Sequence, residues 1–193
     1  LHSVVGCNFG SMSLHVAQDM RDIRQTCTVI SDSDVVFSGE ASLERAVRSA
    51  LELFQPSVLF VVSGCVSEMI GDDIPAVLAR IPHEAPLLHV EAAGFRGDAA
   101  RGLEAGWLAL LPLMKPPVPR PYPRPYPRSD PRPLVNLIGL GMDDPHAADD
   151  VEALRAMLAP QAALGAVLSR CTLEEVRRAP YADVNLVLRG KGR

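Results

Sequence analysis

The chain has 193 residues and a formal net charge of −4, and 48% of its residues are hydrophobic and 22% charged. This composition is typical of a globular protein that buries a core without disulfides, and the negative charge argues against nucleic-acid binding. The sequence has no apolar run long enough to cross a bilayer and no secretory signal, so we expect a cytoplasmic protein with no membrane partner. Because Leu1 rather than Met begins the chain, we expect an internal fragment, with natural sequence lost before Leu1.

Residues 1–115 alternate between short apolar runs and helical patterns, which predicts a first α/β domain. Four apolar runs predict strands at residues 1–5, 34–37, 58–62 and 87–90. Helices are predicted where apolar residues recur every three or four positions: at 9–22, at 42–54 with Ser42 as cap, after Asp72-Asp73, and after Asp98. This alternation is typical of a parallel sheet with helices on both faces (Rossmann-like), in which ligands bind beyond the carboxyl ends of the strands.

Residues 116–133 differ in composition, because nine of the eighteen are proline and Pro-Arg-Pro-Tyr occurs twice. Proline fixes φ and removes an amide donor, so this segment is predicted to be an extended polyproline II linker. We interpret it as a semi-rigid spacer between domains. The alternative is a ligand for an aromatic-lined groove of the SH3 type.

Residues 134–193 begin a second α/β pattern. It predicts strands at 134–140, 165–169 and 184–188 and helices at 149–158 and 173–178. Gly139-Leu-Gly141 follows the first of these strands, but a dinucleotide-binding turn needs a third glycine where this chain has Asp144. Nucleotide binding is therefore not expected. The segment is short for a whole doubly wound domain, so we interpret it as the start of one, with sequence lost after Arg193.

The main candidate ligands are cysteines. The chain has four, Cys7, Cys27, Cys65 and Cys171. None belongs to a CxxC pair, so a self-contained zinc or ferredoxin site is not expected. Cys7 and Cys65 each follow a predicted strand and a glycine, Gly6 and Gly64; there, backbone N–H groups favour a thiolate and the glycine lets a bulky ligand approach. The plainer alternative is four buried thiols that behave as small hydrophobic groups.

The carboxylate pair Asp72-Asp73 is a weaker candidate for a metal site. A helix cap and a first-turn acid already account for two such residues, and we favour this structural role. The five histidines are scattered along the chain without a metal-binding spacing. No acid–base constellation is visible, so we predict no catalytic residue.

Four stretches carry short motifs in a fixed order. They are Leu1–Cys7, which ends in Gly-Cys, Asp34–Glu40 (Asp-Val-Val-Phe-Ser-Gly-Glu), Cys65–Ile74 (with Ile-Gly-Asp-Asp-Ile) and Gly94–Gly97. In motif, order and spacing they resemble the first domain of the nitrogenase component 1 family, with Ser38 where that family usually has glycine. The family includes catalytic nitrogenase subunits, cofactor-assembly scaffold homologues and nitrogenase-like reductases of tetrapyrrole biosynthesis. Residues 134–188 resemble the start of the family's second domain more weakly.

The resemblance implies that Cys7 and Cys65, with Gly6 and Gly64 beside them, bind an iron–sulfur cluster at a subunit interface. Two cysteines cannot hold a [4Fe-4S] or larger cluster alone, so the other ligands would come from a partner chain or from sequence absent here. Cys27 and Cys171 match no ligand of the family, and we interpret both as structural.

The function implied by the resemblance is that of a subunit of a nitrogenase-like metallocluster oxidoreductase. Its partners would be a homologous subunit, in a homo- or hetero-oligomer, and an ATP-dependent iron–sulfur reductase protein that supplies electrons. Nitrogen fixation is one such setting, but the substrate stays open. The fragment alone is expected to be inactive. Two alternatives are a non-catalytic scaffold for assembly of a cofactor of the iron-molybdenum type, and a cluster-free interaction module.

Overall fold

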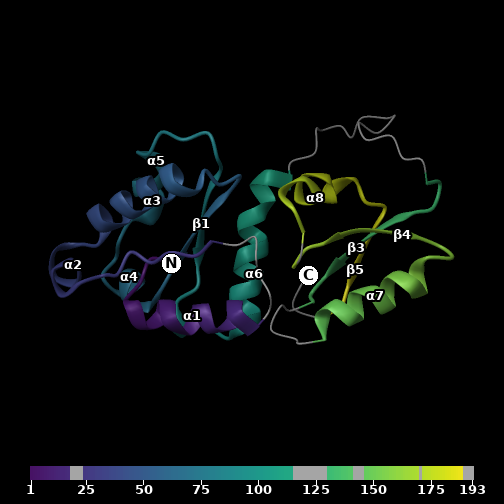
Figure 1. Ribbon diagram of the computed structural model, residues 1–193, viewed down its shortest axis with the longest axis horizontal. Helices are drawn as coiled ribbons and strands as arrows, with labels where there is room; N and C mark the ends of the chain where they lie inside the picture. The colour runs from purple at the N-terminus through teal and green to yellow at the C-terminus, as the bar shows by residue number, and fades with distance from the viewer. Residues whose placement is uncertain (18–23, 115–129, 141–145, 170, 189–193) are drawn as a thin grey trace. The chain divides into compact units, whose positions relative to one another are not determined.

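The chain divides into two compact units, Leu1–Ala109 and Leu110–Arg193 (Figure 1). The computed structural model describes residues 1–17, 24–114, 130–140, 146–169 and 171–188. Both units combine helices with parallel strands, which confirms the predicted α/β class. Most of the proline-rich segment predicted at 116–133 lies outside the described residues, as does the end of the helix predicted at 9–22. Among the described helices, none is both long and apolar enough to span a membrane.

The first unit is built around two parallel strands. Its elements are α1 (Val5–Ala17), α2 (Asp32–Phe37), α3 (Glu40–Phe54), β1 (Leu59–Ser63), α4 (Cys65–Met69), α5 (Ile74–Ala79), β2 (Leu87–Glu91), η1 (Gly94–Arg96) and α6 (Ala99–Leu110). Leu59 lies opposite Leu87 and Ser63 opposite Glu91, so β1 and β2 are paired over their whole length. His2 adds an isolated parallel bridge to Ser63. Residues 1–3 therefore extend the array on the far side of β1.

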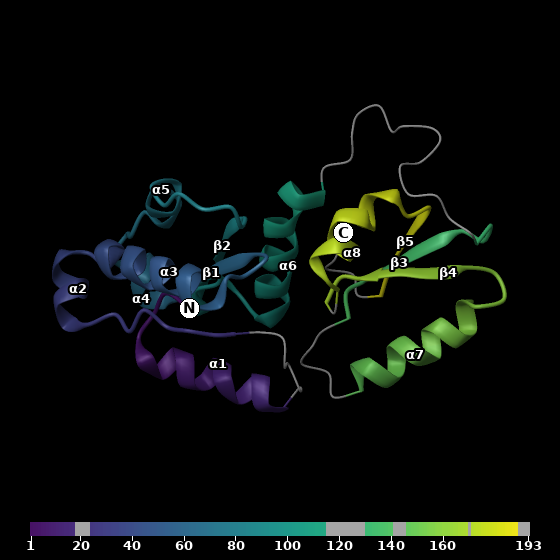
Figure 2. The same ribbon diagram turned by 45° about the horizontal axis from the view of Figure 1, so that its top comes forward.

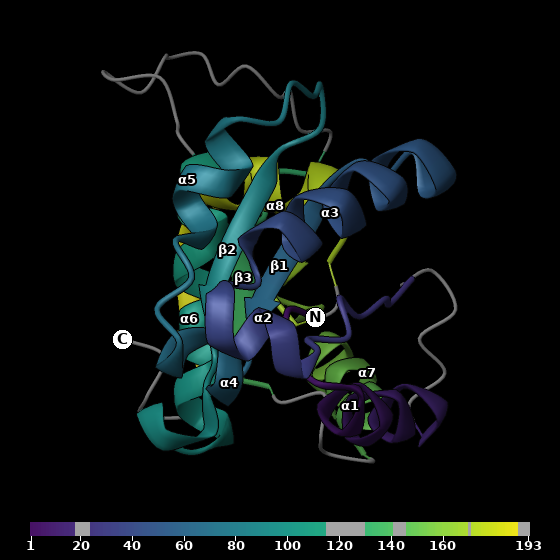
Figure 3. The ribbon, with the colours of Figure 1, turned by 90° about the vertical axis from the view of Figure 1, so that its left-hand side faces the viewer.

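The core of the first unit forms where α3 and α5 cover one face of β1 and β2 (Figure 3). Its buried side chains are Leu43, Val47, Val61, Ile74, Val77, Leu78 and Ile81. Leu43 and Val47 are four residues apart, which is the helical spacing that the sequence predicts for this face. The helix ends as predicted before Pro56, where Gln55 adopts a left-handed conformation with φ of 43°.

Two predictions for the start of the chain are wrong. Residues 34–37 are not a strand but the end of helix α2, because Ser31 and Asp34 form a reciprocal capping box that starts a helix despite the β-branched residues. Residues 1–5 form only the single bridge at His2, and α1 begins at Val5. Cys7 therefore lies in the first turn of a helix rather than in a loop before it.

The predicted cap at Ser42 is also wrong, because α3 begins earlier with Gly39 as its N-cap. A Cβ atom on Gly39 would lie 2.6 Å from Asp72 Oδ2, so only glycine fits this close approach. The Gly39 amide donates to Asp72 Oδ1 at 2.9 Å. Ser42 instead donates from its hydroxyl to Asp34 Oδ1 at 2.8 Å.

The second unit is a three-stranded parallel sheet of order β4-β3-β5 (Figure 2). Its elements are η2 (Leu111–Met114), β3 (Leu134–Ile138), α7 (Ala147–Leu158), β4 (Ala163–Val167), α8 (Leu173–Arg178), η3 (Ala179–Tyr181) and β5 (Val184–Val187). Each strand and helix predicted after residue 133 is present, with ends shifted by up to two residues. Of the glycine turn, Gly139 is described and has φ of 96°, whereas Gly141 and Asp144 lie outside the described residues.

Candidate functional site

The candidate site lies at the carboxyl edge of the first sheet. The His2 amide donates to Val62 O at 2.9 Å, and the Gly64 amide donates to His2 O at 3.0 Å, so residues 1–3 run beside the end of β1. From this edge the chain turns into α1 after residues 1–3, into α4 after β1 and into η1 after β2. Figures 1 and 3 both show α1 and α4 at the same end of the strand pair. The fold thus carries Cys7 and Cys65 at the starts of two helices that leave one sheet edge.

The two cysteines differ in their surroundings. Cys7, in the first turn of α1, is exposed. Cys65, the first residue of α4, is half-buried, and its Sγ accepts a hydrogen bond from the Gly94 amide at 3.1 Å. That donor comes from the loop after β2, not from the helix that Cys65 begins. Neither residue is fully buried.

The glycines beside the cysteines also differ. A Cβ atom on Gly64 would lie 2.2 Å from Ser3 Oγ, so this position must be glycine to accommodate the buried Ser3. Next to Gly6, a Cβ would meet no atom within 4 Å. Gly64 therefore has a packing role that the sequence did not predict. The cofactor-binding role predicted for Gly6 and Gly64 stays a prediction.

The charged group closest in sequence to Cys65 is Glu68, whose side chain is only 7% exposed. It forms an ion pair with Arg96, which also lies 3.0 Å from Glu91. Burial alone would raise the pKa of Glu68, but hydrogen bonds from Ser63 and Arg96 outweigh it and lower that pKa. Glu68 is therefore a buried carboxylate that stays ionised at neutral pH.

A buried histidine and aspartate, which sequence reasoning missed, join segments far apart in the chain. His2 Nε2 lies 2.9 Å from Asp72 Oδ2, and the two side chains are 0% and 1% exposed. Asp72 Oδ1 also accepts from the Ser38 hydroxyl at 2.9 Å. Burial lowers the pKa of His2, although Asp72 opposes the shift. Seventy residues separate the partners in the sequence, and no local pattern indicates that they meet.

The predicted capping role of the acidic pair is confirmed for one member and wrong for the other. Asp73 is the N-cap of α5, and its Oδ1 accepts from the Ala76 amide at 3.0 Å. Pro75 occupies the first turn, as expected from its missing amide hydrogen. Asp72 instead points to His2, so the two adjacent carboxylates serve different partners.

The remaining cysteines have backbone partners. Cys27 Sγ lies 3.3 Å from Ser3 O, which it can donate to, and it accepts from the Val29 amide at 3.4 Å. Cys171 belongs to the second unit and is half-buried, and burial raises the pKa of its thiol to about 11. A thiol with that pKa is almost fully protonated at neutral pH and is a poor metal ligand.

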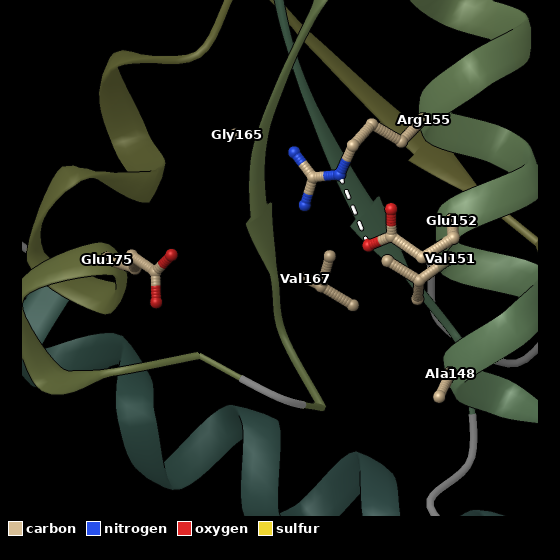
Figure 4. Close-up of a pocket in the computed structure, with 7 residues that line it drawn as sticks. All are labelled: Ala148, Val151, Glu152, Arg155, Gly165, Val167 and Glu175. Carbon is tan, nitrogen blue, oxygen red and sulfur yellow. Dashed lines mark hydrogen bonds and ion pairs between the residues drawn. The ribbon is translucent and has the colours of Figure 1, made fainter.

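The second unit carries an open cavity of about 290 Å³ between α7 and β4 (Figure 4). It is lined by Ala148, Val151, Glu152, Arg155, Gly165, Val167 and Glu175. Its charged groups already have partners: Arg155 Nε lies 3.4 Å from Glu152, and Glu175 accepts from the Thr172 amide at 2.7 Å. None of the predicted site residues lines this cavity, so it does not compete with the sheet edge as the candidate site.

Comparison with known proteins identifies the family of the chain. The whole chain, residues 1–193, matches the family described as Nitrogenase component 1 type Oxidoreductase. The chain belongs to this family. The family resemblance predicted from the four motifs is thereby confirmed.

Relatives of this family member include two nitrogenase iron-molybdenum cofactor biosynthesis proteins NifE. The protein from Rippkaea orientalis is 40% identical over 86 residues, which are 44% of this chain and 18% of the relative. The protein from Methanosarcina barkeri is 31% identical over 173 residues, which are 83% of this chain and 35% of the relative. Among solved structures, a chain of nitrogenase Cp1 at pH 5 matches with a TM-score of 0.70 and 23% identity, over 99% of this chain and 39% of that one. At this identity the structural likeness concerns the fold alone.

The thiols of Cys7 and Cys65 are the groups of this nitrogenase-family chain that could hold an iron–sulfur cluster. Both cysteines carry the soft sulfur that iron prefers, and the Gly94 amide donates to the Cys65 sulfur. Within the described ranges, no group of three or more His, Cys, Asp and Glu is placed to hold a metal ion. A cluster bound through Cys7 and Cys65 would therefore need ligands from outside these ranges.

Proposed function

We propose that the chain is part of a nitrogenase-like metallocluster oxidoreductase in which Cys7 and Cys65 bind an iron–sulfur cluster, [4Fe-4S] or larger. A homologous subunit would supply further ligands at an interface. The cluster would relay electrons from an ATP-dependent iron–sulfur reductase protein to a substrate site built elsewhere. The observation that carries this proposal is the position of both cysteines at one carboxyl sheet edge, with an amide donor on Cys65 Sγ.

The residues of this chain would bind and orient the cluster. Iron–sulfur clusters supply one-electron chemistry, and the surrounding protein sets their potential through charge, hydrogen bonds and burial. The Gly94 N–H group would stabilise negative charge on the Cys65 sulfur. Val5 and Phe9 are 62% and 78% exposed near Cys7 in the sequence, and apolar surface of this kind suits an interface with a second subunit.

A scaffold for assembly of a metallocofactor is the second candidate. It is favoured by the relatives named as iron-molybdenum cofactor biosynthesis proteins, one of which matches over 83% of this chain. Because the chain spans only 18% and 35% of those two relatives, residues outside it would decide between the two roles. Both roles require the cluster, so the ligand assignment is common to them.

Anaerobic reconstitution of the intact protein with iron and sulfide tests the ligand assignment. Wild-type protein should take up iron and show the visible absorption of a cluster. Cys65→Ala and Cys7→Ala should each lose most of the bound iron, because each removes a thiolate ligand that the fold does not replace. Cys171→Ala is the matched control and should retain wild-type iron content. Iron uptake unchanged by Cys65→Ala would overturn the assignment.

A second experiment separates the enzyme from the scaffold. The reconstituted protein and its homologous partner are mixed with a reductase protein, ATP and a reductant. Turnover of a small substrate supports the oxidoreductase. Transfer of a metallocofactor to a cofactor-free nitrogenase, without turnover, supports the scaffold. If the protein shows neither turnover nor cofactor transfer and takes up no iron, the results support the cluster-free interaction module.

A further inference from the structure

The Glu68 carboxylate is hydrogen-bonded to the loop that carries the amide donor to Cys65. Glu68 belongs to α4, three residues after Cys65, and the loop after β2 carries Ala93, Gly94 and Arg96. The buried Glu68 carboxylate therefore joins helix α4 to the loop after β2, whose residue Ala93 lies 25 positions further along the chain. A buried charge in this position needs several hydrogen-bond donors to be tolerated.

The donors come from three places. The Ser63 hydroxyl, at the end of β1, donates to Glu68 Oε1 at 2.5 Å. The Ala93 amide donates to the same oxygen at 3.2 Å. Arg96 Nε donates to Glu68 Oε2, and its guanidinium is held from the other side by Glu91 at 3.0 Å. The carboxylate thus ties the end of β1, the loop after β2 and helix α4 together.

Gly94 lies between two of these anchored residues. The Ala93 amide and the Arg96 guanidinium are both bound to Glu68, so the peptide group between them has little freedom to turn away. In this position the Gly94 amide points at Cys65 Sγ, 3.1 Å away. An Arg96 amide hydrogen bond to Ala93 O, at 2.9 Å, closes the same turn.

We propose that Glu68 is a positioning residue: it holds the loop after β2 so that the Gly94 amide donates to Cys65 Sγ, and it thereby tunes the reduction potential of the bound cluster. The tuning rests on the proposed function, because it requires that Cys65 ligate the cluster. Hydrogen bonds to cluster sulfurs stabilise the more negative, reduced state, so loss of the Gly94 bond lowers the potential. The lowered pKa of Glu68 and the raised pKa of Arg96 agree with a permanently charged anchor.

Two substitutions separate the anchoring role from the effect of charge. Glu68→Asp keeps the charge but shortens the side chain by one methylene, so the carboxylate cannot reach Ser63 and Ala93 together. Glu68→Gln removes the charge but keeps one oxygen that can accept from Ser63 and Ala93, while its amide nitrogen cannot accept from Arg96. The readouts are the midpoint potential and the electron paramagnetic resonance spectrum of the reconstituted cluster. Glu44→Gln, which breaks a surface ion pair with Arg48 in the same unit, is the control.

An anchoring role and an effect of charge predict different reduction potentials for the two Glu68 variants. If Glu68 acts as proposed, Glu68→Asp lowers the reduction equilibrium constant by about three- to tenfold, up to about 59 mV for one electron, at unchanged iron content. Glu68→Gln stays at or above the wild-type potential, and Glu44→Gln does not change it. A wild-type potential in Glu68→Asp overturns the proposal. Should that variant misfold, Ser63→Ala is tested for a smaller shift in the same direction, and no shift overturns the proposal.

A measurement without the cluster keeps this inference separate from the proposed function. Hydrogen–deuterium exchange of peptides covering residues 93–96 is compared in cluster-free wild-type protein, Glu68→Asp and Glu68→Gln. Faster exchange in Glu68→Asp than in Glu68→Gln supports the anchoring role. Equal exchange in all three proteins overturns it. If the wild type takes up no iron, the cluster assignment fails, while exchange still decides whether Glu68 holds this loop.

Discussion

The two units use the same parallel α/β design but place their buried polar groups differently. In the first unit, four buried polar residues gather at the carboxyl end of β1: His2, Ser3, Ser63 and Ser67. In the described part of the second unit the buried polar residue is Asn136, in the middle of β3. Its side-chain amide donates to Ala179 O and accepts from the Ala166 amide, at 2.8 and 3.0 Å.

The buried polar residues of the two units therefore have different structural roles. Asn136 joins neighbouring strands and η3, so it strengthens the sheet itself. The polar residues of the first unit instead fix the loops that leave the sheet: Ser67 Oγ donates to His2 O at 2.9 Å, and Ser63 donates to Glu68. Loops held at fixed positions by a rigid sheet are where binding groups are usually placed. The comparison predicts that disturbing the first unit's edge affects both stability and iron uptake, whereas disturbing the second unit affects stability alone.

The largest effect is expected for Asp72→Ala. The substitution leaves His2 buried without its partner and removes the acceptor for Ser38 and Gly39. Each buried donor left without its acceptor costs about 1–3 kcal/mol, and this substitution leaves both the His2 ring and the Gly39 amide without one. Urea unfolding followed by the fluorescence of Trp107, the chain's one tryptophan, which lies in the first unit, measures this loss. A loss below about 1 kcal/mol would mean that the pair contributes little to the edge.

A smaller loss is expected for Gly64→Ala. The new Cβ would lie 2.2 Å from Ser3 Oγ and 2.7 Å from Ser3 Cβ, so the first segment must move away from β1. Overpacking of this kind costs about 1–3 kcal/mol, and we expect the upper end together with reduced iron uptake. Removal of the Ser3 side chain in a Gly64→Ala/Ser3→Gly double variant should recover part of the loss. If the double variant recovers no stability, the contact with Ser3 is not the reason why position 64 requires glycine.

The elements with long, regular patterns could be predicted from the sequence. The helix around Leu43 and Val47, the apolar run of β1, and the helix at 173–178 all follow from periodicity and capping residues close together in the chain. The segment at 34–37 was predicted wrongly because Val35, Val36 and Phe37 favour a strand by composition. Ser31 lies just outside that window and starts a helix through its capping box.

The candidate site could be predicted only where it depends on local motifs. Cys7 and Cys65 were identified because each follows a glycine after an apolar run. The His2–Asp72 pair, the Ser3–Gly64 contact and the Gly94 donor join residues 29 to 70 positions apart. Only the folded sheet brings such residues together, so no spacing in the sequence predicts these contacts.

Gly165→Ala is the counterpart of Gly64→Ala in the second unit and is expected to cost less. A Cβ on Gly165 would lie 2.7 Å from Asn136 Oδ1, so the amide must shift from the Ala166 N–H group. One weakened hydrogen bond and a local shift cost about 1–2 kcal/mol. Hydrogen exchange in β3 and β4 measures this loss. Iron uptake should stay at the wild-type level, and a reduced uptake would contradict the separation between the two units.

The smallest effect concerns pH and the first unit. Burial lowers the pKa of His2 in the folded protein, so below its unfolded value of about 6.5 only the unfolded chain gains the proton. The free energy of unfolding therefore falls as pH drops through this range, by at most about 0.7 kcal/mol from pH 7 to pH 6 for one histidine. Burial also lowers the pKa of His89, which adds a change of the same sign. His2→Gln should reduce the pH dependence measured by Trp107 fluorescence without removing the part due to His89. An unchanged slope in that variant would show that His2 takes up its proton equally in both states, which would contradict the lowered pKa.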